Sequence, residues 1–265
     1  MLKFCEKVGH TIIGWWLIVK DFVSLACQTT YWIFVGPFQK KPIKRPAVFE
    51  QMVFMGVNSI IIVFFVTLFT GVVLAMQSAY QLSQMGGTIY VASLVTISIC
   101  RELGPVLTAL VIAGRIGAAI TAEIGSMKVN EQIEALETMA INPVRFLVVP
   151  KLISLFFMLP CLTIFGDLAG SFGGYMVGVW NLGINSHLYL QTAFKYLSLK
   201  DIYTGLSKSF VFALIITLVG CYQGFKTKGG AVGVGRATTV SVVTSFILII
   251  VADCIVTAIY YFADM

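Results

Sequence analysis

Charge is scarce in this 265-residue sequence, in which only 11% of the residues are Asp, Glu, Lys or Arg. Soluble domains carry about 25% charged residues. No charged residue occurs between Gln51 and Cys100, and 58% of the chain is hydrophobic. These proportions exclude a soluble globular protein and predict an integral membrane protein. The formal net charge of +6 is spread over several loops, so no nucleic-acid binding is expected.

The residue groups that usually carry chemistry are also missing. His10 and His187 are the two histidines, and neither belongs to a ligand set or a catalytic triad. The six cysteines form no C-x-x-C pair and fall mostly in apolar runs, so we expect neither a metal site nor a disulfide. No nucleophile–base pair is evident, and we therefore expect no catalytic residue.

The sequence contains no phosphate-binding loop of the form GxxxxGK[ST]. The glycine-rich segment "KGGAVGVGRATT" at 228–239 has its lysine at the wrong end for such a loop and precedes an apolar run. We predict a flexible cytoplasmic turn here, with Thr238 or Thr239 capping the helix that follows. If the chain takes part in transport, the energy must be supplied from outside it.

Five apolar runs are long enough to cross a membrane, which requires about 20 residues in a helix. They lie near residues 53–78, 89–115, 147–180, 203–225 and 238–262. Because they are too long and too uniformly apolar for barrel strands, they are predicted to be helices. We expect an all-α membrane protein with a five-helix domain over residues 51–265, whose long third span tilts or bends around Pro160.

The first fifty residues have a different pattern. Polar side chains recur at helical spacing from Lys3 to Gln28, and several aromatic residues suit a headgroup boundary. We predict an amphipathic helix, or two, lying in the membrane interface over residues 3–35, followed by a basic linker up to residue 50. A sixth span near residues 22–39 is the alternative. No cleavable signal peptide is expected, because this region carries seven Lys and Arg residues and no short apolar core.

Basic residues are distributed unevenly between the two sides of the membrane. If the chain has five spans and a cytoplasmic N-terminus, two basic residues, Lys195 and Lys200, fall on the periplasmic side. Fourteen fall on the cytoplasmic side: Lys3, Lys7, Lys20, Lys40, Lys41, Lys44, Arg45, Arg115, Lys128, Arg145, Lys151, Lys226, Lys228 and Arg236. Because cytoplasmic loops concentrate Lys and Arg, the N-terminus is predicted to be cytoplasmic and the C-terminus periplasmic.

Five charged residues lie inside the predicted spans, away from their cytoplasmic ends: Arg101, Glu102, Asp167, Lys208 and Asp253. Each would cost about 2.5–3.5 kcal/mol if it faced lipid at mid-bilayer, so each should face protein or a watery cavity. All of them except Asp167 are expected to gather in the outer half of the membrane or near its middle. Two interpretations stay open for this cluster: a polar path through the membrane, or a buried network that fixes helix register.

The main soluble insertion is "GSMKVNEQIEALETMAINP" at 125–143, for which we predict a short cytoplasmic helix over 130–140. Asn130 is the expected N-cap, and Asn142–Pro143 ends the helix. Acidic positions (Glu131, Glu134, Glu137) and apolar positions (Ile133, Leu136, Ala140) occupy separate faces. This pattern favours docking to a partner; the alternative is a helix resting on the bilayer, where an acidic face suits anionic headgroups poorly.

Small residues recur every fourth position in two spans, at Gly166, Gly170, Gly174 and Gly178 and at Ala113, Gly117, Thr121 and Gly125. Such stripes allow helices to approach closely. Packing within the chain is the expected use for most of them, and a homodimer seam is the alternative.

Two blocks of sequence resemble a known family. "RELGPVLTALVIAGRIGAAITAEIGSMKVNEQIEALETMAINP" (101–143) resembles the signature of the MlaE family of ABC-transporter permeases, and "GGAVGVGRATTVSVVTSFILIIVADCIVT" (229–257) resembles its C-terminal block. The resemblance covers residues 50–265. It implies an interfacial N-terminal helix, five spans and a homodimer that works with cytoplasmic ATPase subunits, which bind ATP and Mg²⁺, and with a periplasmic MCE-domain protein. Such proteins move phospholipid between the bacterial inner membrane and the periplasm or outer membrane.

The resemblance also implies roles for individual residues. The segment from Glu131 to Met139 resembles the coupling helix that sits in a groove of the ATPase. Ile133 and Leu136 are expected to fill that groove, with the glutamates at its rim. Arg101, Glu102, Lys208 and Asp253 match the intramembrane charges of the family. The lipid pocket of such proteins lies between the two subunits near the outer end of the first span, which here implies Leu74, Gln81, Leu82 and Met85.

Two other classes of protein stay open on the residues alone. An ion-coupled secondary transporter would use Glu102 and Asp253 as proton sites, but it would leave the acidic cytoplasmic helix unexplained. A membrane scaffold that only tethers a periplasmic protein would not require charges inside the membrane.

Overall fold

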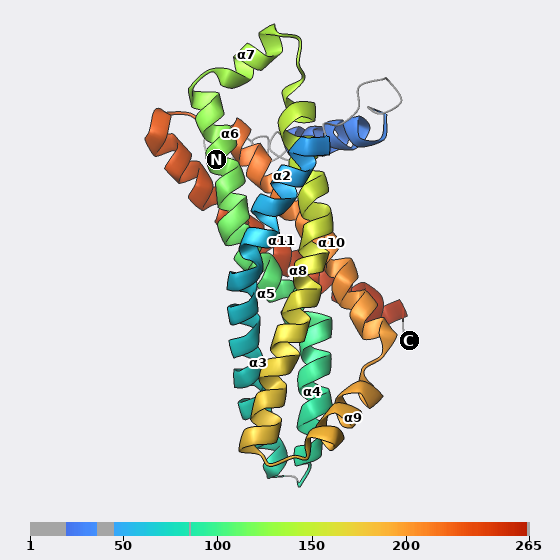
Figure 1. Cartoon of the computed structure of the whole chain (residues 1–265). Coiled ribbons are helices and arrows are strands. Elements are labelled where there is room, and N and C mark those ends of the chain that lie inside the picture. The colour runs from blue at the N-terminus through green and yellow to red at the C-terminus, as the bar shows by residue number, and fades with distance from the viewer. Residues whose placement is uncertain (1–19, 36–44, 85, 264–265) are drawn as a thin grey trace, which may run out of the picture.

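The protein is built from long helices, which a computed structural model describes for residues 20–35, 45–84 and 86–263 (Figure 1). Within those residues all regular structure is helical. Five helical segments are long and apolar enough to cross a membrane: Arg45–Ser83, Thr88–Val129, Val144–Asn181, Leu199–Phe225 and Gly230–Ala263. The predicted all-α fold with five spans is confirmed, and each span is longer than its apolar run in the sequence.

Several spans consist of consecutive helical elements. The first contains α2 (Arg45–Met55), η1 (Val57–Ser59) and α3 (Ile60–Ser83). The second contains η2 (Thr88–Tyr90), α4 (Val91–Ser98), η3 (Ile99–Leu103), α5 (Gly104–Ile112), η4 (Ala113–Gly117) and α6 (Ala118–Val129). The third contains η5 (Val144–Val148), α8 (Val149–Met176) and η6 (Val177–Asn181), and α8 continues through Pro160. The fourth and fifth are α10 (Leu199–Phe225) and α11 (Gly230–Ala263), and α7 (Gln132–Thr138) and α9 (Ser186–Tyr196) connect spans.

Glycines hold α3 and α8 in backbone contact. A Cβ atom added at Gly71 would lie 1.9 Å from the carbonyl oxygen of Gly170, and one at Gly173 would lie 2.3 Å from that of Leu68. No side chain fits between the two helices at these points, which explains the small residues there. Gly170 belongs to one of the two predicted small-residue stripes, and its use here is packing within the chain.

The core lies between the second, third and fourth spans. Ile112, Ile116, Ile120 and Ile124 recur every fourth residue of the second span and are at most 1% exposed. They share one buried cluster with Leu155 of α8 and residues of α10. Helix α11, by contrast, has large apolar side chains that are exposed, such as Ile250. An apolar outer surface of this kind suits lipid or another subunit.

A helical segment at residues 20–34, blue in Figure 1, lies across the end of the bundle near α7. Asp21 forms an ion pair with Lys226 at 3.1 Å, and the ring of Phe22 packs edge-on against Tyr222 at 5.7 Å. Burial acts to lower the pKa of Lys226, but its hydrogen bonds to Tyr222 and Asp21 outweigh burial and raise it. Residues 1–19 and 36–44 lie outside the described residues, so the predicted interfacial helix and the alternative sixth span stay predictions.

The glycine-rich segment 228–239 is not the flexible turn that the sequence predicts. Helix α11 already begins at Gly230, and Thr238 and Thr239 donate hydrogen bonds within it to the carbonyl oxygen of Gly235. The turn itself ends at Gly229 and Gly230, which both have positive φ angles. Glycine adopts positive φ angles without strain, so Gly229 and Gly230 permit this tight turn. The glycines that follow within α11 each cost the helix only about 1 kcal/mol relative to alanine.

Candidate functional site

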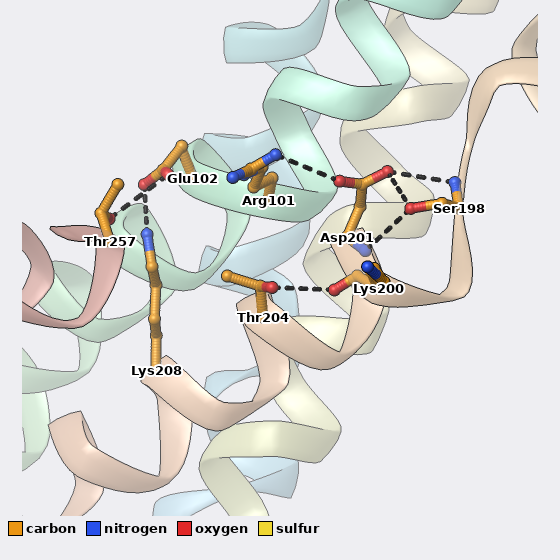
Figure 2. A network of polar contacts seen from close by, with 8 residues as sticks. All are labelled: Arg101, Glu102, Ser198, Lys200, Asp201, Thr204, Lys208 and Thr257. Atoms are coloured by element: carbon orange, nitrogen blue, oxygen red, sulfur yellow. Dashed lines mark hydrogen bonds and ion pairs between the residues drawn. The ribbon is translucent and has the colours of Figure 1, made fainter. Parts of the chain in front are cut away.

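A group of charged side chains joins the second, fourth and fifth spans (Figure 2). At its centre is Lys208 of α10, whose side chain is fully buried. Its ammonium contacts the Glu102 carboxylate on η3 and lies 2.8 Å from Oδ1 of Asp253 on α11. Thr257 of α11 also donates a hydrogen bond to Glu102, at 3.4 Å. The structure brings Glu102, Lys208 and Asp253 together, and we refer to them as the Lys208 cluster.

A π-helical turn positions Glu102 and its neighbour Arg101. Residues Ile99–Leu103 form this turn, and Pro105 follows it in the first turn of α5. A Cβ atom at Gly205 would lie 2.1 Å from the carbonyl oxygen of Cys100, so α10 touches the backbone of the turn. Such one-turn π insertions are frequent at functional sites.

Arg101 has its ion-pair partner outside the Lys208 cluster. The sequence predicts that it gathers with the other intramembrane charges, but its NH1 lies 3.5 Å from Oδ1 of Asp201 (Figure 2). Asp201 is 8% exposed and accepts hydrogen bonds from the backbone and hydroxyl of Ser198. Ser198 and Asp201 form a capping box at the start of α10. Asp201 was missed because it precedes the apolar run, although the S-x-x-D pattern signals such a cap.

The Lys208 cluster carries more negative than positive charge. One ammonium faces two carboxylates, and the side chains of Glu102 and Asp253 are 35% and 23% exposed whereas that of Lys208 is not exposed. Lys208 therefore serves as the link between spans, while Glu102 also reaches the surface of the described chain. Removing one member of a buried ion pair costs about 3–5 kcal/mol, so breaking this link would strongly destabilise the folded protein.

A second ion pair lies at the end of the bundle that carries α7. Lys151, only 2% exposed, is 2.6 Å from Oε2 of Glu123. Both residues, with Gln51, Asn142 and Arg145, line a cavity of about 500 Å³. Sequence reasoning counted Lys151 among loop residues and did not single out Glu123, because α6 continues well beyond the predicted end of its span.

A helix lies within the segment for which a short cytoplasmic helix is predicted, but it starts later and is shorter than 130–140. Asn130 is the C-cap of α6 and not an N-cap, and α7 covers Gln132–Thr138. Glu131 adopts a left-handed conformation with φ of 57° where the chain reverses between the two helices. The difference arises because α6 extends to Val129, so the turn falls where the cap was expected.

The two large apolar side chains of α7 point into the protein. Ile133 and Leu136 are 4% and 8% exposed and belong to the main core cluster, so they cannot fill a groove on another protein. Glu134 pairs with Lys128, whose hydrogen bond lowers the pKa of the glutamate. Glu137 is exposed. The face turned away from the protein consists of Glu131, Gln132, Ala135, Thr138 and Met139.

Three of the four residues implied for a lipid pocket lie in the C-terminal part of α3. Leu74 and Leu82 are half-buried against the neighbouring core cluster, Gln81 is exposed, and Met85 lies outside the described residues. Next to them an exposed stripe runs along α3, formed by Phe65, Phe69, Val73, Met76 and Tyr80. Sequence reasoning passed over this stripe, although its spacing of three and four residues was visible.

Five apolar helices long enough to cross a membrane, with ionisable side chains paired between them, define a polytopic membrane protein. The sequence matches the family model described as Permease MlaE over residues 48–259, so the chain belongs to the MlaE permease family. It is 42% identical over 260 residues to a probable ABC transporter permease protein of Rickettsia typhi, covering 98% of this chain and 94% of that protein.

Two further relatives are similar over most of their length. The chain is 34% identical over 264 residues to the intermembrane phospholipid transport system permease protein MlaE of Haemophilus influenzae, covering 98% of each. It is 40% identical over 211 residues to a probable ABC transporter permease protein of Synechocystis, covering 80% of each. The resemblance drawn from residues 101–143 and 229–257 is thereby confirmed, and the protein is a multi-pass ABC transporter permease.

Proposed function

We propose that this chain is the permease subunit of a phospholipid transporter that moves lipid between the bacterial inner membrane and the periplasm or outer membrane. The Lys208 cluster is the observation that supports a transport mechanism, because ionisable groups inside membrane spans commonly mark substrate or ion pathways. The similarity to a phospholipid transport permease of Haemophilus influenzae supports lipid as the substrate.

The energy for transport comes in this proposal from ATP and Mg²⁺ bound to a separate cytoplasmic ATPase. The outward face of α7 is its docking surface. Because Ile133 and Leu136 anchor α7 in the same core cluster as Ile124 of α6 and Val148 of η5, a force applied to α7 reaches the second and third spans. This arrangement supports a coupling role for α7 through its exposed residues.

The orientation that goes with this proposal has a cytoplasmic N-terminus and a periplasmic C-terminus. Helix α7 and the segment 20–34 lie at one end of the bundle (Figure 1). The turn after α10 lies there too, since Lys226 pairs with Asp21. Lys20 of the helical segment, Lys128 at the end of α6, and Lys226 and Lys228 of the turn then face the cytoplasm, as the positive-inside rule favours.

Two further partners complete the proposal. A second copy of the chain covers the exposed stripe of α3, and the lipid pocket lies between the copies at Leu74, Gln81, Leu82 and Met85. A periplasmic MCE-domain protein receives the lipid at the outer end. The apolar character of the stripe, in which every side chain is at least 50% exposed, supports an apolar ligand at this surface.

Reconstitution tests the proposal directly. The purified permease and its copurifying ATPase are placed in proteoliposomes with a fluorescent phospholipid, and transfer to acceptor protein is followed. Transfer should require ATP and Mg²⁺ and should be unaffected by a protonophore. Transfer that is driven by a proton gradient without ATP would replace the proposal by the ion-coupled alternative. If the permease supports no transfer at all, the result would favour the membrane scaffold instead.

A further inference from the structure

A second cavity, of about 400 Å³, lies between α4, η3, α8, α9 and the start of α10. It is separate from the Lys208 cluster and from the proposed lipid pocket on α3. Its lining is mostly apolar, but it includes one carboxylate, that of Asp167 on α8. The volume is within the range of roughly 300–1,000 Å³ that is usual for small-molecule sites.

Asp167 differs from the other carboxylates buried between the spans because it has no cationic partner. Its Oδ1 is buried and accepts no hydrogen bond from any residue that the structure describes. Gly104 leaves room for this oxygen, since a Cβ atom there would lie 1.7 Å from it. Glu102 and Asp253 share Lys208, so the absence of a lysine or arginine beside Asp167, within the described ranges, sets this site apart.

Aromatic rings form much of the remaining wall. Phe172 and Tyr175 stack at 6.3 Å, and Tyr175 meets Tyr189 edge-on at 5.5 Å. The hydroxyl of Tyr189 is buried and has no hydrogen-bond partner in the described chain, and burial raises the pKa of Tyr189 to about 12, so it stays neutral. A carboxylate among aromatic rings is the arrangement that binds organic ammonium groups, which are attracted by both.

The cavity lies where the head of a membrane lipid could enter it. Ile202, in the first turn of α10, lines it, so in the proposed orientation it is level with the outer end of the fourth span. Leu168, Phe172 and Phe194 line it while remaining 65%, 52% and 70% exposed. These exposed apolar side chains connect the cavity to the surrounding lipid.

We propose that this cavity binds the ammonium headgroup of an outer-leaflet amphiphile, with the headgroup at Asp167 and the acyl chains in the membrane. The phospholipid class that fits is one with an ammonium in its headgroup, such as phosphatidylethanolamine. The site itself requires no transport activity, and only its level in the membrane rests on the proposed orientation.

Lipid retention by the purified full-length chain tests this site without the ATPase. The chain is placed in nanodiscs with equal amounts of phosphatidylethanolamine and phosphatidylglycerol of the same acyl chains, and the lipids it retains are counted by native mass spectrometry. The parent should retain phosphatidylethanolamine in excess. Asp167→Asn should lower that excess about fivefold, the factor expected for one partly exposed ion pair. Glu50→Gln, on an exposed carboxylate of α2, should leave it unchanged.

Two more arms separate the possible outcomes. Leu190→Trp narrows the cavity while keeping the carboxylate, and it should also lower the excess if Asp167→Asn proves too unstable to purify. Free ethanolamine, which has the ammonium but no chain, should displace little of the lipid. An unchanged lipid ratio in folded Asp167→Asn, or in Leu190→Trp, would overturn the proposal. So would full displacement by ethanolamine, which would mean that the site takes a small cation.

Discussion

Replacing Lys208 by methionine removes the ammonium that links three spans while keeping most of the side-chain volume. Glu102 and Asp253 would then face one another without a cation. Loss of one partner from a buried ion pair costs about 3–5 kcal/mol. The lower value of about 3 kcal/mol applies here, because both carboxylates are partly exposed and can be rehydrated.

The expected loss is large enough to measure by thermal unfolding. One kcal/mol shifts the melting temperature of a chain of about this size by roughly 2–4 °C, so Lys208→Met should melt about 6–12 °C below the parent. Tryptophan fluorescence of the purified chain in detergent follows the transition. Lys228→Met is the matched control, since Lys228 is exposed in the turn before α11. A Lys208→Met protein that melts within about 2 °C of the parent would refute the link.

The same cluster can be removed without leaving a charge. Combining Lys208→Met with Glu102→Gln and Asp253→Asn should restore most of the stability, because replacing a whole buried ion network is often nearly neutral. The triple variant also separates the two interpretations of the cluster. Restored stability without transport would identify a polar path, whereas restoration of both would identify a network that only fixes helix register.

Three shorter predictions concern other parts of the fold. Asp201→Asn weakens the partner of Arg101 and the cap of α10, and should lower the melting temperature by about 2–6 °C, as expected for a lost cap; an unchanged melting temperature would exclude a stabilising role. Gly71→Val should prevent the contact of α3 with α8, detected as loss of folded protein by gel filtration, and a well-folded variant would contradict the packing. A C-terminal alkaline phosphatase fusion should be active and one at Lys228 inactive; the reverse pattern would invert the proposed orientation.

The number of spans could be read from the sequence because hydropathy in lipid leaves few alternatives. Only helices satisfy their own backbone hydrogen bonds there, so each apolar run had one structure available. Their ends could not be read in the same way. Helix α6 continues through Lys128 to Val129, and α11 starts at Gly230, since helices extend into water wherever packing supports them.

The sequence could indicate that the intramembrane charges need partners, but not every partner. The cost of a charge in lipid required Glu102, Lys208 and Asp253 to find partners, and these three found one another. Arg101 lies next to Glu102 in sequence but on another side of the π-helical turn, so it meets Asp201 instead. A periodicity of 3.6 residues cannot reveal a π insertion, and the direction of Arg101 could only come from the structure.

The structure changes which face of α7 is available to the proposed ATPase partner. An apolar stripe on a short helix can face a partner or its own chain, and periodicity does not distinguish the two. In the structure Ile133 and Leu136 face inward, so Leu136→Asp should destabilise the permease itself by burying a charge.

A substitution on the outward face separates docking from folding. Ala135 is exposed in the middle of that face and Met139, 61% exposed, lies one turn further on. Ala135→Asp should leave the melting temperature within about 2 °C of the parent, because the new carboxylate stays in water. The same variant should lose the copurifying ATPase, since a charge at the centre of an interface commonly costs about 2 kcal/mol or more. Glu50→Gln serves as the control for ATPase recovery. If Ala135→Asp retains the ATPase and ATP-driven lipid transfer in full, α7 does not couple the two subunits.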